Sequence, residues 1–118
     1  MTEFSVVTEI SEQPRVVIVK TTGYIEDRAG EKIKSVVHVL MEKGEKNFLF
    51  HLGGSPIINS TGISCMLEVI EEITCEVQGW VGLCCLTKAI KDVFTIMCLL
   101  KEYPAFDTQE AALKTVPK

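Results

Sequence analysis

Residues 57–63 read Ile-Ile-Asn-Ser-Thr-Gly-Ile, and at this point an apolar run ends and a helical pattern begins. Asn59 and Ser60 are of the types that favour a helix N-cap, because a short polar side chain accepts a hydrogen bond from the free backbone N–H groups of the first turn. Apolar residues then recur at helical spacing, at Ile63, Met66, Leu67, Ile70 and Ile73. The stretch predicts an amphipathic helix that runs to about Val77 with Ser60 at its exposed start.

Ser60 has two interpretations from the residues alone. A serine at a helix start is most often only a cap. The positive end of the helix dipole also favours a phosphate there, and phosphorylation adds a charge of about −1.5 to −2 without unfolding the helix. Thr61 is the second hydroxyl in this turn, and it either accepts a phosphate in place of Ser60 or supports the turn.

The chain has 118 residues, of which 47% are hydrophobic and 24% charged, and this balance fits one globular domain over residues 1–118. Its net charge of −4 argues against nucleic-acid binding, which requires clustered Lys and Arg. The start has no targeting pattern, and no apolar segment approaches the ~20 residues needed to cross a bilayer. We therefore expect a soluble, cytoplasmic protein that is not inserted in a membrane.

The five cysteines are an odd number, with no C-x-x-C pair and no histidine at metal-ligand spacing. We expect most of them to be buried as small hydrophobic residues in a reducing compartment. The pattern predicts no metal site and no cofactor, and neither histidine forms a nucleophile–base pair with a cysteine at a supporting spacing.

Strand and helix patterns alternate along the rest of the chain. Strands are expected at 4–10, 16–19, 47–52, 81–86 and 105–106, with a hairpin turn at 11–14. Helices are expected at 29–43, from 60 to about 77, around Ile90–Met97, and after a cap at Asp107 or Thr108. This order predicts an α/β fold, a mixed sheet of four or five strands with about four helices packed on it.

Four segments carry a resemblance to a known family. They are Gly-Tyr-Ile-Glu at 23–26, Phe-Leu-Phe-His-Leu at 48–52, Ile-Asn-Ser-Thr-Gly-Ile at 58–63, and the tail at 106–113. In this order they resemble STAS domains, and the whole chain resembles a stand-alone bacterial anti-anti-sigma factor, also called an anti-sigma factor antagonist. The resemblance implies a STAS-type fold and a non-enzymatic role in transcription regulation.

The resemblance also implies a partner and a switch. The partner is a serine kinase that is itself the anti-sigma factor, and it phosphorylates a serine at the position of Ser60. The unphosphorylated protein binds this kinase and frees a sigma factor, and the phosphorylated protein lets go. The implied partner-binding residues are Glu26, His51, Asn59, Ser60, Thr61, Gly62 and Ser64.

Three of these positions depart from the family pattern. Asn59 and His51 stand where aspartates are usual, and Glu26 stands where the family often has aspartate. If those carboxylates help the kinase, phosphorylation of Ser60 is slowed or lost. The alternative function is a non-phosphorylated STAS subunit or ligand-sensing module of a transporter or a multi-protein sensory complex.

Several further residues have two interpretations. His51 is either a titrating group near the loop or a hydrogen-bonded structural imidazole. Trp80 is either a contact anchor or a cover over the end of the sheet. Gly62 admits a partner's backbone or avoids crowding where helix meets sheet. The acidic stripe of Glu68, Glu72 and Glu76, at i, i+4 spacing on the second expected helix, is either a solvated face or a contact for a basic partner. The apolar segment Met97–Leu100 is compatible with weak self-association.

Overall fold

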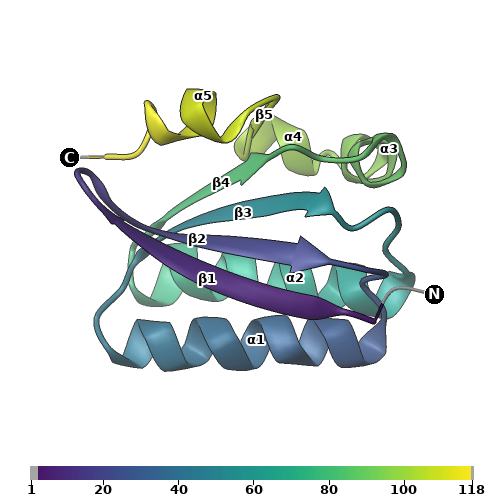
Figure 1. Cartoon of the computed structure of the whole chain (residues 1–118), viewed down its shortest axis with the longest axis horizontal. Coiled ribbons are helices and arrows are strands. Elements are labelled where there is room, and N and C mark those ends of the chain that lie inside the picture. Colours follow the sequence, from purple (N-terminus) through teal and green to yellow (C-terminus); the bar gives the residue numbers. More distant parts are fainter. Residues whose placement is uncertain (1–2, 118) are drawn as a thin grey trace.

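A five-stranded mixed sheet organises the computed structural model, which describes residues 3–117 (Figure 1). The strands are β1 (Ser5–Glu12), β2 (Arg15–Thr22), β3 (Asn47–Gly54), β4 (Trp80–Cys84) and β5 (Ala105–Phe106). They lie in the order β1-β2-β3-β4-β5, with β1 antiparallel to β2 and the remaining pairs parallel. The predicted mixed α/β sheet is confirmed.

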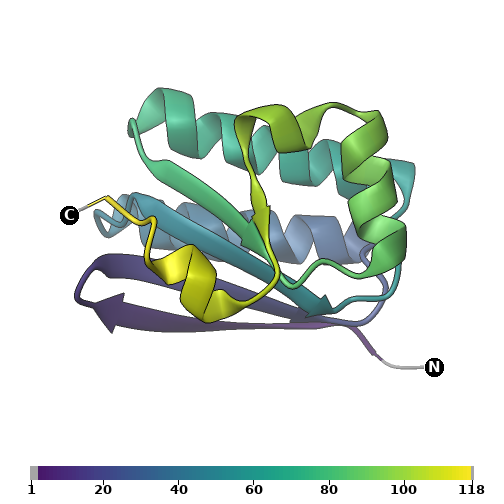
Figure 2. The same cartoon turned by 90° about the horizontal axis from the view of Figure 1, so that it is seen from above.

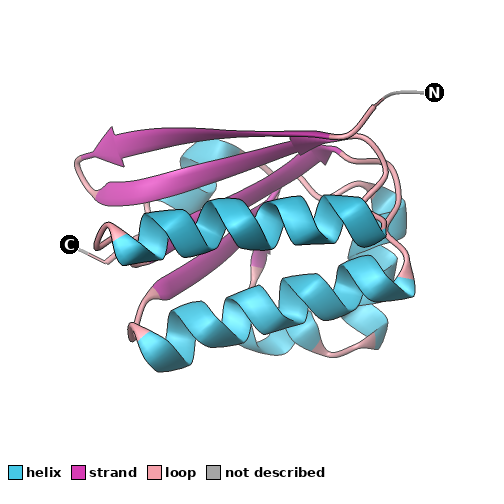
Figure 3. Ribbon diagram, turned by 90° about the horizontal axis from the view of Figure 1, so that it is seen from below, coloured by secondary structure: helices cyan, strands magenta, loops and turns pink. Residues whose placement is uncertain are grey.

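Helices cover both faces of this sheet. They are α1 (Asp27–Glu42), α2 (Ser60–Glu76), α3 (Lys88–Ile96), α4 (Leu99–Glu102) and α5 (Gln109–Leu113). The two long helices α1 and α2 lie side by side on one face (Figure 3), and the short helix α5 lies on the other (Figure 2). The described residues thus hold one helix more than expected, because a left-handed residue at Cys98 (φ 61°) separates the short helix α4 from α3.

Strand β2 shows why the sheet is covered twice. All four residues at 16–19 are buried, as their uniformly apolar sequence predicts. Val17 and Val19 join the main core with α1 and α2, whereas Val16 and Ile18 join a smaller core under α5. Successive side chains point to opposite faces of a strand, so one apolar run supplies both cores.

Element boundaries shift from the expected ones for local reasons. Helix α1 begins at Asp27, two residues early, because the Glu26 carboxylate caps it by accepting from Ala29 N–H at 3.3 Å. Strand β4 ends at Cys84, two residues early, because Cys85 takes a left-handed backbone conformation with φ 59°. Of the two caps expected for the last helix, Thr108 is the one used.

The buried face of α2 is rotated from the one that its apolar spacing predicted. Cys65 and Val69 are buried, while Ile63 and Leu67 are only partly buried. The cause is α1, which packs beside α2 and turns the buried arc toward itself. Truncating Leu67 to Ala should therefore cost less than the ~2–5 kcal/mol expected for a fully buried leucine.

An ion pair ties the β1–β2 turn to the segment between α1 and β3. Arg15 Nε donates to Glu45 Oε1 at 3.1 Å, and a second guanidinium nitrogen donates to Oε2 of the same carboxylate. Glu45 is buried, and its hydrogen bond with Arg15 holds its pKa below the ordinary value. A carboxylate with a lowered pKa stabilises the fold above its unfolded pKa, and this stabilisation is lost as the pH falls through the folded pKa.

We expect the free energy of unfolding to fall between about pH 5 and about pH 3, with Glu45 carrying part of the change. Denaturant titrations across this range measure it. Glu45→Gln should flatten the profile, whereas Glu12→Gln, which removes the exposed partner of Arg15, should flatten it less. Equal slopes for wild type and Glu45→Gln would contradict this.

Candidate functional site

Two loops lie side by side where β2 and β3 end. Ile25 N–H donates to the Ile57 carbonyl at 3.0 Å, and Asn59 N–H donates to the Ile25 carbonyl at 3.1 Å. Ile25 and Ile58 form an isolated parallel bridge and are buried beneath the loops. The carboxyl ends of parallel strands are where open α/β sheets place functional groups. The hydrogen bonds between the two loops hold the surface at the start of α2 in one arrangement.

Ser60 is the first residue of α2, and its side chain is exposed. Asn59 caps the helix, with its Oδ1 accepting from Gly62 N–H at 2.8 Å. Thr61 and Ser64 are also exposed, but the Ser64 hydroxyl donates to the Ser60 carbonyl at 3.1 Å. The expected helix start is confirmed, and Ser60 stands at its solvent side near the positive end of the dipole.

The second side-chain group of Asn59 reaches a carboxylate. Asn59 Nδ2 donates to Asp27 Oδ1 at 3.2 Å, which joins the first turn of α1 to the cap of α2. Asp27 lies before the helix expected at 29–43 and is separated from Asn59 by 32 residues of sequence. The surface beside Ser60 therefore holds a negative charge, although position 59 has none. Glu26 lies next to Asp27 but is occupied as the cap of α1.

Gly62 lets α2 lie close to the loop that follows β2. The residue is buried, and a Cβ built on it would lie 2.4 Å from the Ile25 carbonyl oxygen. Glycine thus allows α2 to approach the loop after β2, which favours the second of its two interpretations. Tyr24 and Ile57 flank the surface with 39% and 49% of their area exposed.

Comparison with known proteins assigns the family. The model of the STAS domain matches residues 8–112. The chain belongs to the STAS domain family. Within the part the structure describes, this STAS protein has no helix that is both long and apolar enough to cross a membrane.

The relatives of this STAS protein include anti-sigma factor antagonists. A putative anti-sigma factor antagonist, BtrV from Bordetella bronchiseptica, is 29% identical over 90 residues, covering 76% of this chain and 77% of its own. The crystal structure of a putative anti-sigma factor antagonist from Thermotoga maritima has a TM-score of 0.86 at 18% identity, over 96% of this chain and 95% of its own. SpoIIAA from Bacillus, in its phosphorylated form, has a TM-score of 0.74 at 18% identity, over 93% and 97%.

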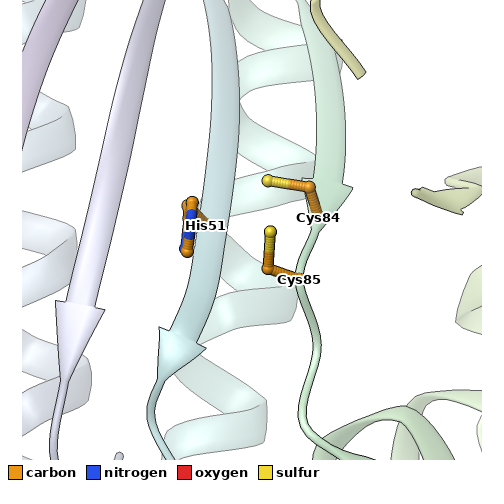
Figure 4. A group of neighbouring side chains, drawn as sticks. All are labelled: His51, Cys84 and Cys85. Carbon is orange, nitrogen blue, oxygen red and sulfur yellow. The ribbon is translucent and has the colours of Figure 1, made fainter. Parts of the chain in front are cut away.

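His51 lies on the other face of the sheet from α2. In β3, Phe50 and Leu52 face the main core with α1 and α2, so His51 between them faces the α5 side. Its Nδ1 accepts from Gly53 N–H at 3.2 Å, which fits the structural interpretation of this imidazole. In this STAS domain the imidazole also lies beside two thiols, Cys84 and Cys85, which local spacing did not predict (Figure 4).

The cysteines differ from expectation. Two are buried, Cys65 and Cys84; Cys85 is partly exposed, and Cys75 and Cys98 are exposed, so the prediction that most are buried is wrong. Cys75 lies on the outer face of α2, and Cys98 follows the end of α3. Burial and the neighbouring Cys85 raise the pKa of the Cys84 thiol to about 12.

The acidic stripe of α2 is largely engaged within the STAS domain. Glu68 pairs with Lys34 at 3.1 Å, and Glu72 contacts His38 Nε2 at 2.9 Å. These contacts join α2 to α1 across 34 residues of sequence. Only Glu76, at the end of the stripe, lacks such a contact among residues 3–117.

Two other features lie away from Ser60. Trp80 packs on the smaller core, as expected for a cover over the sheet, and it also lines an open groove of about 840 Å³ at the amino ends of β3 and β4. In the apolar segment expected to allow self-association, Leu99 is buried and Leu100 is partly buried, whereas Met97 and Cys98 are exposed. Ile96, just before this segment, has 81% of its area exposed. Ile96 and Met97 are therefore the large apolar side chains that this region exposes.

Asn59→Ala should lower the free energy of unfolding by about 0.5–2 kcal/mol, because it removes the cap of α2. It also removes the hydrogen bond to Asp27. Urea denaturation followed by circular dichroism measures the loss. Thr61→Ala is the control, since it changes an exposed residue in the same turn and should alter stability little. If the two variants were equally stable, the capping role of Asn59 would be wrong.

Proposed function

We propose that this STAS protein is an anti-sigma factor antagonist whose partner is an anti-sigma factor with serine kinase activity, and that phosphorylation of Ser60 controls their binding. The observation that carries the proposal is the exposed Ser60 hydroxyl at the first residue of a capped 17-residue helix, on a fixed surface. The name of the Bordetella relative and the phosphorylated form of the Bacillus neighbour support it.

The surface around Ser60 has the composition of a protein-docking site. Tyr24 and Ile57 provide partly exposed apolar area on its two sides. Asp27 and Asn59 add polar groups held in place by their mutual hydrogen bond. Such a mixture of apolar anchors and fixed polar groups suits a protein partner, and the net charge of −4 does not suit nucleic acid.

Charge, rather than refolding, performs the switching in this proposal. A phosphate on Ser60 lies at the positive end of the α2 dipole, where the helix tolerates it. It also lies next to the Asn59–Asp27 pair, so it adds a second negative group to a surface that already holds a carboxylate. A docking partner must then desolvate or oppose both charges, which weakens the complex.

Asp27 reduces the effect that we expect from the missing aspartates at positions 59 and 51. Without Asp at position 59, the nearest acidic side chain joined to the α2 cap is Asp27, through its hydrogen bond with Asn59. We infer that this carboxylate supplies part of the negative charge that the substitutions at Asn59 and His51 remove. We therefore still propose that the partner kinase phosphorylates Ser60, and that this takes place in the cytoplasm.

Phosphorylation in vitro tests the proposal. The protein is incubated with ATP and each purified serine kinase anti-sigma factor of its source bacterium, and its intact mass is recorded. We expect a mass gain of one phosphoryl group that disappears in Ser60→Ala and persists in Thr61→Ala. Binding without any mass gain would favour the alternative, a non-phosphorylated STAS subunit, and neither binding nor a mass gain with any of these kinases would overturn the proposal.

A further inference from the structure

Two cysteines and one histidine meet at the carboxyl ends of β3 and β4. In the parallel register, His51 pairs with Cys84, so both side chains stand on the α5 face. Cys85 follows, and its left-handed backbone turns its side chain toward the same place. Figure 4 shows the two sulfur atoms between β3 and β4, with the imidazole beside β3. One ligand atom from each residue lies within 4.8 Å of the others.

The backbone at Cys85 is in a sparsely populated region for a residue other than glycine. Such strain persists only where the surroundings fix it, and Cys85 N–H is held by the Phe106 carbonyl at 2.9 Å. In an extended conformation, Cys85 would point to the face opposite Cys84. The turn therefore brings two consecutive thiols to one side of the sheet, an arrangement that a regular strand forbids.

We propose that His51, Cys84 and Cys85 form a zinc site with three protein ligands and one open position. Two thiolates and an imidazole are a soft ligand set of the kind that zinc prefers, and three protein ligands leave a fourth position for water or another donor. Zinc is chosen over magnesium or calcium because those ions require oxygen ligands.

The required geometry is close to the observed one. Tetrahedral zinc, with bonds of about 2.3 Å to sulfur and 2.0 Å to nitrogen, places its ligand atoms roughly 3.5–3.8 Å apart. The three atoms already lie within 4.8 Å of one another, so each pair needs to close by about 1.3 Å at most. Rotation of the side chains supplies that movement without displacing the paired strands.

The neighbours of the cluster suit a metal. Gly53 N–H donates to His51 Nδ1 at 3.2 Å, so this nitrogen carries the lone pair that a metal ion needs. A zinc ion bound to Nδ1 would replace this hydrogen bond. Gly53 also leaves room: a Cβ there would lie 2.8 Å from His51 Cε1 and 3.3 Å from Cys85 Cβ. His51 and Cys85 are partly exposed, which gives an ion a path from solvent to the buried Cys84.

The charges near the cluster also permit zinc. Lys20, the register partner of His51 on β2, is the nearby cation, and Glu110 on α5 is the nearby anion. Two thiolates and a neutral imidazole bring the charge of bound Zn²⁺ to zero, so no further ligand charge is needed. The thiol protons leave to solvent as the ion binds.

Metal titration of the isolated protein tests the site independently of any partner or of Ser60 phosphorylation. Reduced, metal-free protein is titrated with Co²⁺ under anaerobic conditions and then with Zn²⁺ in competition with a chromophoric chelator. We expect a thiolate-to-cobalt charge-transfer band that saturates at one equivalent and is displaced by zinc. His51→Ala, Cys84→Ser and Cys85→Ser should each weaken binding by at least about tenfold.

The exposed cysteines provide matched controls. Cys75→Ser and Cys98→Ser should leave the band and the affinity unchanged, and circular dichroism checks that every variant is folded. Absence of the cobalt band in the wild-type protein would overturn the site. A band that survives in the double variant Cys84→Ser/Cys85→Ser, or that disappears equally in Cys75→Ser, would overturn it as well.

Discussion

Ser60→Glu is expected to weaken binding of the partner anti-sigma factor by at least about tenfold, or about 1.4 kcal/mol. The carboxylate lies at the exposed start of α2, next to the Asn59–Asp27 pair, so a second negative group enters the docking surface. Like charges brought together in an interface cost binding energy, and each must be desolvated. Isothermal titration calorimetry with the purified partner measures the change.

Ser60→Gln is the matched control for that variant. It adds a side chain of the same length and shape without the charge. The favourable interaction between a carboxylate and the positive end of the helix dipole is therefore absent from Ser60→Gln. We expect Ser60→Gln to bind more tightly than Ser60→Glu, with the two variants equally stable to within about 1 kcal/mol. If both variants bound as weakly as each other, bulk at position 60 rather than charge would be responsible.

Gly79→Ala should destabilise the fold by about 3 kcal/mol. A Cβ built on Gly79 would lie 1.8 Å from the Lys46 carbonyl oxygen, which is backbone and cannot yield as a flexible side chain does. That carbonyl accepts from Trp80 N–H at 3.1 Å, and Gly79 N–H donates to the Ile73 carbonyl at 2.8 Å. We therefore expect the extra methyl group to push the start of β4 away from the start of β3.

Gly44→Ala gives the comparison for Gly79. Gly44 has φ +98° and nothing within 4 Å of the added Cβ, so its substitution carries only the conformational cost, about 1 kcal/mol or slightly more. Urea denaturation of both variants gives the two losses. Equal losses would mean that close approach to Lys46 is not what requires glycine at position 79.

The two glycines show how far the sequence predicts the fold. Both follow the helices expected at 29–43 and from 60 to about 77, and α1 and α2 do end shortly before them, at Glu42 and Glu76. Yet only Gly44 is left-handed; after α2 that conformation belongs to Gln78, with φ 49°. Strand and helix patterns depend on local burial and are visible in one sequence, whereas contact with Lys46 depends on how β3 and β4 pair.

The same distinction explains the candidate site. Asn59 and Ser60 were predictable as a helix start, because capping is a local interaction. Asp27 was missed because its hydrogen bond to Asn59 joins residues 32 apart. The thiols of Cys84 and Cys85 were missed beside His51 because parallel pairing and one left-handed residue bring them together. A histidine and a cysteine near the ends of two expected neighbouring strands were the available sign.

The proposed docking surface around Ser60 and the thiol cluster lie at the same end of the sheet, on different faces. Ser60 begins α2 on the face covered by α1 and α2, and His51 points to the face covered by α5 (Figures 1 and 4). His51 was expected in the partner-binding set; its Nδ1 accepts from Gly53 N–H, and its ring lies beside the two thiols. Variants of Ser60 and of Cys85 can therefore be tested separately.

Control by phosphate is tested by the affinity of the partner kinase for this protein with and without a phosphate on Ser60. Phosphoserine is incorporated at position 60 during synthesis, and titration calorimetry compares the two forms. We expect phosphorylation to weaken binding at least about tenfold, and at least as much as Ser60→Glu does, while both forms keep the same circular dichroism spectrum. Equal affinity of the two forms would contradict it.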